Sequence, residues 1–310
     1  MSFIIFGTLL MNYLITGGTG MIGRALIKSL NHEKNNILVL TRTNKNTAKD
    51  SLVNNVKFIN KISLSHIDTA DIIINLAGEP IAGKRWSKKQ KDTICQSRWQ
   101  LTEQITGLIK ESKTPPSLLI SGSAIGIYGR QTNKTIDESF IDYHDEFTHH
   151  LCSTWESLAL SAQSELTRVV TLRTGIVLGL SGGALKEMLL PFKLGFGGKM
   201  GTGKQIMSWI HIDDMISAII HIQDNNQLIG PVNMTANNAV TNEEFSHKFA
   251  QSLHKPCLLS TPSIIVRCLF GEMSDVLLYG QHVKPSKLLT SGFVFKYPDL
   301  RVALDSLFNT

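Results

Sequence analysis

The chain has 310 residues, 42% of them hydrophobic and 18% charged, with a formal net charge of +6, a composition that predicts a globular protein with a large core. Its Lys and Arg residues are scattered instead of forming a long basic run, which argues against nucleic-acid binding, although the basic excess would suit an anionic cofactor or substrate. The 4 cysteines form no Cys-x-x-Cys pair, which argues against a zinc or redox site and favours a reduced, cytoplasmic protein.

The first residues, 1–10, are apolar but too short to cross a membrane, and they lack the basic start of a signal peptide. Met11 stands directly before the first predicted strand. We therefore interpret residues 1–10 as a non-native extension from an upstream start codon, and we expect no membrane association. Detection of Met1 as the N-terminus of the natural protein by mass spectrometry would contradict this interpretation.

A glycine-rich turn follows that strand, in the sequence Asn12-Tyr-Leu-Ile-Thr-Gly-Gly-Thr-Gly-Met-Ile-Gly23. A strand, this turn and the helix-forming segment 21–30 come in the order that a dinucleotide-binding fingerprint requires. The free N–H groups and the helix dipole would face the cofactor's phosphates. Gly17 would turn the chain, Gly20 would admit the pyrophosphate and Gly23 would let the helix pack closely. We assign this cofactor site to Gly17, Thr19, Gly20, Met21, Ile22 and Gly23.

The second predicted strand, residues 36–41, leads directly into Arg42. An NAD site carries Asp or Glu near this point to hold the ribose 2′-hydroxyl, whereas an NADP site carries Arg. A guanidinium pairs well with a 2′-phosphate, so the sequence favours NADP(H). The alternative is that Arg42 is a solvated loop residue.

Strands are also predicted at 56–59, 71–75, 118–123 and 168–173, and helices at 86–110 and 146–163. Strands that alternate with helices and are apolar throughout predict a Rossmann-type α/β fold, with a doubly wound parallel sheet covered on both faces. The strand at 71–75 ends in small residues, where Leu76, Ala77 and Gly78 would lie along the cofactor.

The regular alternation fades after Arg173. A helix at 215–223, a strand at 230–234 and a helix at 241–253 with Thr241 as N-cap are still predicted. We interpret residues 11–173, with 208–235 returning to them, as the NADP-binding domain. Residues 174–207 and 236–305 would form a smaller, interleaved substrate lobe.

Five motifs, in the order TGGTGMIG, NLAG, SGSAIGIYG, RTGIVLG and WIHIDD, together resemble the extended short-chain dehydrogenase/reductase superfamily. The longer strings NLAGEPIAGKRW, FTHHLCSTWE and LPFKLGFGGKMGTGKQIMSWIHIDDM resemble an atypical branch, NAD(P)-dependent epimerase/dehydratase family proteins of unassigned substrate. The resemblance implies an active site with a Ser, a Tyr acting as acid/base and a Lys that holds the nicotinamide ribose. Ser123 matches the family Ser, and within these motifs we assign Ser121 and Arg173 to the cofactor site.

The Tyr-x-x-x-Lys pair of that superfamily is missing, because none of the 5 tyrosines has Lys four positions later. Depending on the register, the two positions fall on Thr148 and Cys152 or on Phe147 and Leu151. His149 is a candidate replacement acid/base, since imidazole titrates near neutrality, although it could equally cap or cover a helix. The neighbouring His and Asp residues match no metal-site spacing, so we expect no metal.

The substrate side is expected in the loops after the strands, with Lys204 as a cation for an anionic group and Trp86 and Trp209 as flat walls. Glu79 and Tyr128 complete this prediction. Arg98 and Trp99, on the long helix, follow the branch pattern and would help to shape the site. Asp213 and Asp214 are expected to cap the helix that follows them.

Together these features predict an NADP(H)-binding, epimerase-family oxidoreductase that acts on a small carbonyl or sugar-like substrate. Its acid/base residue is unassigned. The alternative, favoured by the missing Tyr and Lys, is a catalytically silent NADP(H) sensor or interaction module. Exposed apolar residues on the helix at 86–110 would support a homodimer.

Overall fold

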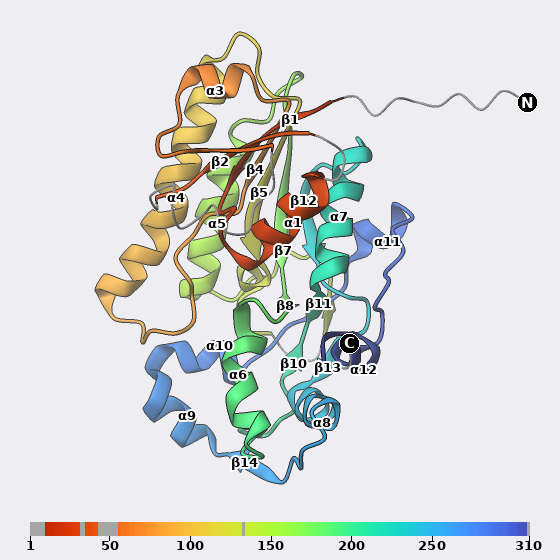
Figure 1. Ribbon diagram of the computed structural model, residues 1–310. Helices are drawn as coiled ribbons and strands as arrows, with labels where there is room; N and C mark the ends of the chain where they lie inside the picture. The colour runs from red at the N-terminus through yellow and green to blue at the C-terminus, as the bar shows by residue number, and fades with distance from the viewer. Residues whose placement is uncertain (1–9, 32–34, 43–54, 132–133, 309–310) are drawn as a thin grey trace, which may run out of the picture.

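A seven-stranded parallel sheet forms the centre of the protein (Figure 1), in the strand order β12-β7-β5-β4-β1-β2-β3. The computed structural model describes residues 10–31, 35–42, 55–131 and 134–308, so residues 1–9 of the predicted extension lie outside the described part. The sheet strands are β1 (Asn12–Thr16), β2 (Asn36–Leu40), β3 (Val56–Ile59), β4 (Ile72–Asn75), β5 (Leu118–Ala124), β7 (Arg168–Thr174) and β12 (Gly230–Met234). Every neighbouring pair is parallel, which confirms the predicted Rossmann-type fold.

Helices cover both faces of this sheet (Figure 1). One layer contains α1 (Met21–Asn31), α7 (Ile212–Asp224) and α11 (Ser286–Thr290), and the other contains α3 (Leu64–Asp68), α4 (Lys88–Glu111) and α5 (Phe147–Leu160). Alternate side chains of β1 pack against the two helix layers, because successive side chains of a strand point to opposite faces of the sheet. Tyr13 and Ile15 pack in the core with α1 and α7, and Leu14 packs in the core with α4 and α5.

A second lobe with its own apolar core lies beyond the C-terminal edge of the sheet (Figure 1). Its helices are α6 (Gly183–Lys193), α8 (Asn242–Ser252), α9 (Ser263–Phe270), α10 (Ser274–Leu278) and α12 (Leu300–Phe308). Short strands pair in twos: β6 (Thr135–Ile136) with β15 (His282–Val283), β8 (Ile176–Leu178) with β11 (Trp209–His211), β9 (Gly198–Met200) with β14 (Leu259–Thr261), and β10 (Ile206–Met207) with β13 (Val240–Thr241). Two short 3-10 turns, η1 (Ile125–Tyr128) and η2 (Gly271–Met273), complete the described elements.

Capping residues explain where several helices begin. Helix α8 starts after Thr241, whose hydroxyl accepts the N–H of Glu244 at 3.1 Å, as predicted. Helix α7 starts at Ile212, three residues earlier than predicted, and its N-cap is His211, whose ring accepts the N–H of Asp213. The prediction that the two aspartates are the caps is therefore wrong. Asp214 instead accepts the N–H groups of residues 296 and 297, and so ties the C-terminal segment to α7.

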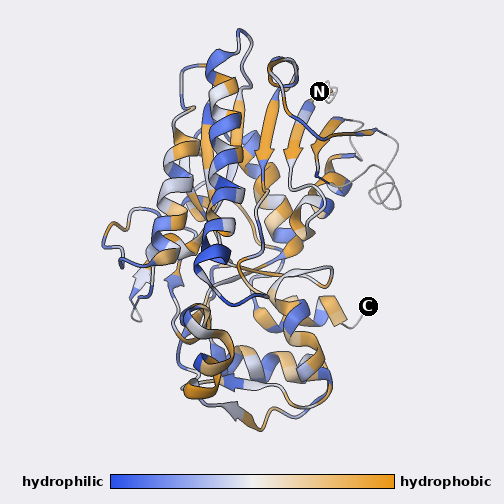
Figure 2. Cartoon of the chain, turned by 90° about the vertical axis from the view of Figure 1, so that its left-hand side faces the viewer, coloured by the Kyte–Doolittle hydropathy of each residue, from blue (hydrophilic) through white to orange (hydrophobic). Residues whose placement is uncertain are grey.

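The outer surface of α4 is polar. Its apolar residues, such as Ile105 and Ile109, are buried, and no large hydrophobic side chain of this fully described helix is exposed. Figure 2 shows the strands as mainly hydrophobic behind a mixed, largely hydrophilic helix layer. The apolar face that would have supported a dimer along this helix is thus absent. Among the described residues, no helix is long and apolar enough to cross a membrane.

Candidate functional site

The glycine turn after β1 has the geometry of a phosphate cradle. Gly17 has a φ of +69°, and a Cβ on it would lie 2.6 Å from the carbonyl carbon of Leu76. A Cβ on Gly23 would lie 2.3 Å from the carbonyl oxygen of Gly17, so only glycine lets α1 start this close to the turn. Gly20 is exposed, and its carbonyl accepts the N–H of Arg24 at 2.9 Å. The first N–H groups of α1 have no carbonyl partner within the helix, which leaves them for a pyrophosphate.

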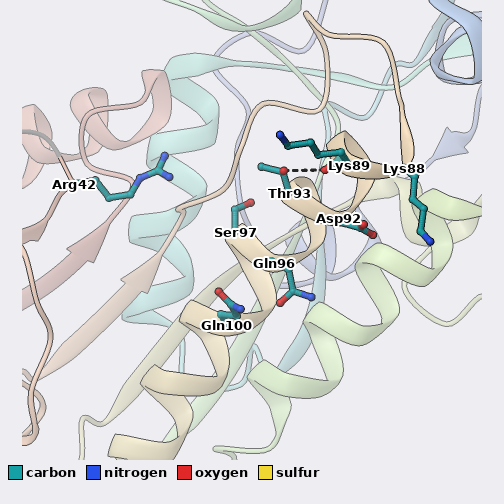
Figure 3. Close-up of a pocket in the computed structure, with 8 residues that line it drawn as sticks. All are labelled: Arg42, Lys88, Lys89, Asp92, Thr93, Gln96, Ser97 and Gln100. Atoms are coloured by element: carbon teal, nitrogen blue, oxygen red, sulfur yellow. Dashed lines mark hydrogen bonds between the residues drawn. The ribbon is translucent and has the colours of Figure 1, made fainter.

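Arg42 lies beside an open cavity of about 710 Å³ at the next strand. Figure 3 shows its side chain directed across this cavity toward the first half of α4. The described lining residues are Arg42, Lys88, Lys89, Asp92, Thr93, Gln96, Ser97 and Gln100. Three cations and one carboxylate give this cavity a positive balance, which suits a phosphate-bearing group.

The segment after β4 is held against the glycine turn by a buried polar chain. The Thr16 hydroxyl donates to Asn75 Oδ1 at 2.7 Å and accepts the N–H of Ala77 at 3.2 Å. The amide of Asn75 donates to Thr102 on α4 at 2.9 Å. Residues 76–78 are thereby fixed at the C-terminal edge of the sheet, directly beside Gly17.

Ser123, at the end of β5, belongs to a buried network. Its hydroxyl donates to Glu156 Oε1 at 2.7 Å, and Arg173 Nε and Nη2 each donate to Glu156 at 2.9 Å. Arg173 Nη1 donates to the hydroxyl of Tyr128 at 3.0 Å. The guanidinium assigned to the cofactor is therefore committed to a bidentate ion pair with α5. Ser121, which was also assigned to the cofactor, is fully buried within the sheet.

Burial and charge set the protonation of this network. Burial alone would lower the pKa of Arg173, but the hydrogen bonds and the charge of Glu156 raise it overall. Burial also raises the pKa of Tyr128 to about 12, against the opposing charge of Arg173. The Tyr128 phenol is thus fully buried and firmly protonated, and it donates to Asn233 at 2.7 Å. Tyr128 therefore holds Arg173 and Asn233 in place through hydrogen bonds, and its ring is not accessible to a substrate.

The missing Tyr and Lys positions can now be placed. Thr148 and Cys152 face Gly126, and a Cβ on that glycine would lie 3.1 Å from Thr148 Cβ and 3.8 Å from Cys152 Sγ. Phe147 and Leu151 pack instead against α4 and Trp86. The geometry therefore favours the register on residues 148 and 152. Burial raises the pKa of Cys152 to about 12, so its thiol carries no charge.

His149 is occupied by structural contacts. Its Nδ1 lies 2.6 Å from the carbonyl oxygen of Ile127, and its ring stacks on Tyr143 with centroids 5.0 Å apart. The hydrogen bond to a carbonyl requires the proton on Nδ1. His149 thus anchors turn η1 on α5, and as an acid/base it stays a prediction. Among the described residues, no cluster of His, Cys, Asp and Glu could hold a metal ion.

The residues assigned to the substrate lie in different places. Glu79 is paired with Lys84 at 3.0 Å, and that hydrogen bond, with weaker help from the charge of Arg42, lowers the pKa of Glu79. Trp86 packs edge-on against Phe147. Lys204 lines a separate cavity of about 160 Å³, with Gln131, Gln205, Ile206, Leu278, Tyr279 and Gly280. Trp209 is fully buried in the core of the second lobe, where it donates to Asn238, so it cannot serve as a wall.

Glu156 is the residue of this network that the sequence analysis did not name. It follows Thr148 and Cys152 at a spacing of four, so all three lie on one face of α5. A carboxylate on a buried face requires a partner, and a buried strand ending in Arg173 supplies one. That complementarity is the sequence signal that would have predicted the pair.

Residues 13–234 match the model of the NAD dependent epimerase/dehydratase family, and residues 261–307 match a domain of unknown function, DUF1731. The epimerase family protein SSP1921 of Staphylococcus saprophyticus is 38% identical over 296 residues, covering 96% of this chain and 99% of that protein. The epimerase family protein YfhF of Bacillus subtilis is 36% identical, and the match covers 96% of this chain and 98% of that protein. The structure of the human epimerase family protein SDR39U1 (isoform 2) with NADPH matches with a TM-score of 0.86 at 30% identity, covering 97% of this chain and 100% of that one.

Proposed function

This chain belongs to the NAD-dependent epimerase/dehydratase family, and on that premise we propose that it binds NADP(H) along the C-terminal edge of its central sheet. We further propose that it transfers hydride between this cofactor and a small carbonyl or sugar-like substrate. The proposal rests on one observation above all, the order of groups along the sheet edge. Arg42 follows β2, the glycine turn follows β1, Gly78 follows β4 and Ser123 ends β5.

This order fits NADP(H) from end to end. The cavity beside Arg42 would hold the adenosine and its 2′-phosphate, and the turn at residues 17–23 would hold the pyrophosphate. The nicotinamide would then reach Gly78 and Ser123 on the next strands of the sheet. The human relative of 30% identity whose structure was solved with NADPH supports the choice of phosphate-bearing cofactor.

NADP(H), when bound, would supply the hydride acceptor or donor. The protein's own part would begin with Ser123, which is 5% exposed and hydrogen-bonded to Glu156. The carboxylate orients the hydroxyl, and the ion pair with Arg173 keeps that carboxylate charged and fixed. A substrate oxygen would accept from Ser123 once the hydroxyl turns away from Glu156. The proton donor is unassigned.

A silent NADP(H) sensor is the second candidate function. The positions of the missing Tyr and Lys hold Thr148 and Cys152, both buried against turn η1, and His149 is bonded to the same turn. The segment therefore supplies no replacement for the missing phenol and ammonium, and the two charged groups at Ser123, Glu156 and Arg173, are paired with each other. A sensor would bind NADPH tightly without turnover.

Binding by the Arg42→Ala variant tests the cofactor assignment. The variant loses a charge-assisted contact worth about 1.5–3 kcal/mol. Its affinity for NADPH should therefore fall by roughly 10- to 150-fold, whereas its affinity for NADH should stay nearly unchanged. Isothermal titration of both cofactors measures this difference. An equal effect on the two cofactors would refute the 2′-phosphate role.

A turnover screen separates the two functions. Consumption of NADPH would be followed against a panel of carbonyl compounds and sugar nucleotides, with Ser123→Ala as the matched variant. Turnover by the wild type that Ser123→Ala lacks supports the oxidoreductase. Tight NADPH binding without turnover of any compound, together with a co-purifying partner protein, supports the sensor.

The free cysteines, of which residues 95 and 152 are buried, support our proposal of a reducing, cytoplasmic location.

A further inference from the structure

Arg98 lies against the backbone at the C-terminal end of β4. It projects from α4, and a Cβ on Gly78 would lie 2.8 Å from its guanidinium carbon and 3.0 and 3.1 Å from Nη2 and Nε. Any residue other than glycine at position 78 would displace the guanidinium. This contact puts a cation one strand away from Ser123, because β4 and β5 are neighbours in the sheet.

The guanidinium of Arg98 has no carboxylate partner in the part of the chain that the structure describes. Within the described chain, no Asp or Glu oxygen lies within 4.0 Å of it, and Glu79 is already paired with Lys84. Nη1 donates to the carbonyl of Ile94 at 3.0 Å and approaches Ser97 Oγ at 3.5 Å, but Nε and Nη2 have no protein acceptor among these residues. Nε–H and Nη2–H are therefore available to donate to a ligand oxygen.

The surroundings of Arg98 keep it in place. The ring of Trp155, on α5, lies 5.2 Å from the guanidinium carbon, within cation–π distance. Trp155 is itself fixed by a hydrogen bond to Thr102, one turn after Arg98 on α4, and by contact with Gly122. Burial lowers the pKa of Arg98, yet a guanidinium stays charged at neutral pH. The cation is therefore held rigidly and is half-buried.

We propose that Arg98 binds the nicotinamide ribose, and so supplies from α4 the cation that the missing Lys would have supplied from α5. Nε–H and Nη2–H would donate to the ribose hydroxyl oxygens as these pass Gly78. The inference rests on the proposed NADP(H) binding. The order of the strands supports this inference. Strand β4 is the neighbour of β1 in the sheet, so the ribose next to the pyrophosphate would lie beside Gly78.

A comparison of two ligands isolates this contact. NADPH carries the nicotinamide ribose, whereas adenosine 2′,5′-bisphosphate carries only the adenosine half. The Arg98→Gln variant should bind NADPH at least tenfold more weakly than wild type and the bisphosphate within twofold, both measured by isothermal titration. Arg301→Gln is the matched control, since it removes an arginine paired with Asp305 on α12, and it should change neither affinity.

The Arg98→Lys variant keeps the charge and tests a structural explanation. It should recover most of the NADPH affinity that Arg98→Gln loses. If Arg98 acts only by packing on Trp155, both variants will weaken the two ligands equally, and that result overturns the proposal. Unchanged NADPH affinity in Arg98→Gln also overturns it. Failure of the wild type to bind either ligand would instead refute the proposed NADP(H) binding itself.

Discussion

Glu156→Gln should be among the most destabilising conservative changes in this protein. Glu156 is 5% exposed and accepts three hydrogen bonds, one from Ser123 and two from Arg173. A glutamine has one acceptor oxygen for these donors, and it leaves the Arg173 charge buried without a counter-ion. Breaking a buried pair in this way costs about 3–5 kcal/mol of unfolding free energy.

Urea unfolding followed by circular dichroism measures this loss by linear extrapolation. Glu187→Gln, at an exposed position of α6, is the matched control and should stay within about 0.5 kcal/mol of wild type. The double variant Glu156→Leu with Arg173→Met should recover most of the loss, because it removes both charges. A loss below about 1 kcal/mol for Glu156→Gln would refute the reasoning that an unpaired buried charge dominates.

Three further changes test other parts of the structure. Ser123→Ala should abolish turnover of any substrate found while NADPH affinity, measured by titration, stays intact; unaltered turnover would remove Ser123 from the mechanism. Thr241→Ala should cost about 1 kcal/mol in urea unfolding, because it removes the N-cap of α8, and a neutral result would contradict the capping role. Burial lowers the pKa of His211 below its usual 6.5, so the unfolded chain binds that proton more readily and stability should fall as the pH drops below about 6.5. His211→Gln should flatten this slope in unfolding experiments between about pH 7.5 and 5.5, and an unchanged slope would assign it to other groups.

The sheet could be predicted well because its strands are short, apolar and punctuated by glycine or small residues. The bounds of β3 and β12 agree with the sequence prediction, and those of β2, β5 and β7 differ from it by one residue at one end. Helices of the second lobe were harder. Helix α6 begins at Gly183, directly after Gly182, and contains Pro191, and α10 is only 5 residues long. Their place is fixed by tertiary packing, which no local period reports.

The candidate site also combines features that the sequence predicts with features that only the fold reveals. The roles of Gly17 and Gly23 in the turn follow from local backbone demands, which a sequence motif records directly. The partners of Ser123 and Arg98 come from α5 and β4, far away in the chain, and only the fold brings them together. Trp209 was wrongly predicted to line the substrate site. A Trp in a Gly-rich stretch suggests an exposed loop, and only the structure shows that this side chain is fully buried.

The loss of the Tyr-x-x-x-Lys pair has a physical consequence that the motif alone does not show. Turn η1 lies directly on α5, with Gly126 within van der Waals reach of both Thr148 and Cys152. A tyrosine at 148 or a lysine at 152 would have to displace this turn, which His149 also holds through the carbonyl of Ile127. Restoring the two residues by Thr148→Tyr and Cys152→Lys should therefore fail to restore family-like acid/base chemistry, and should lower stability through overpacking by at least about 1–3 kcal/mol. A stable double variant with new NADPH-dependent turnover would show that the turn moves aside and that its position is not what keeps the pair out.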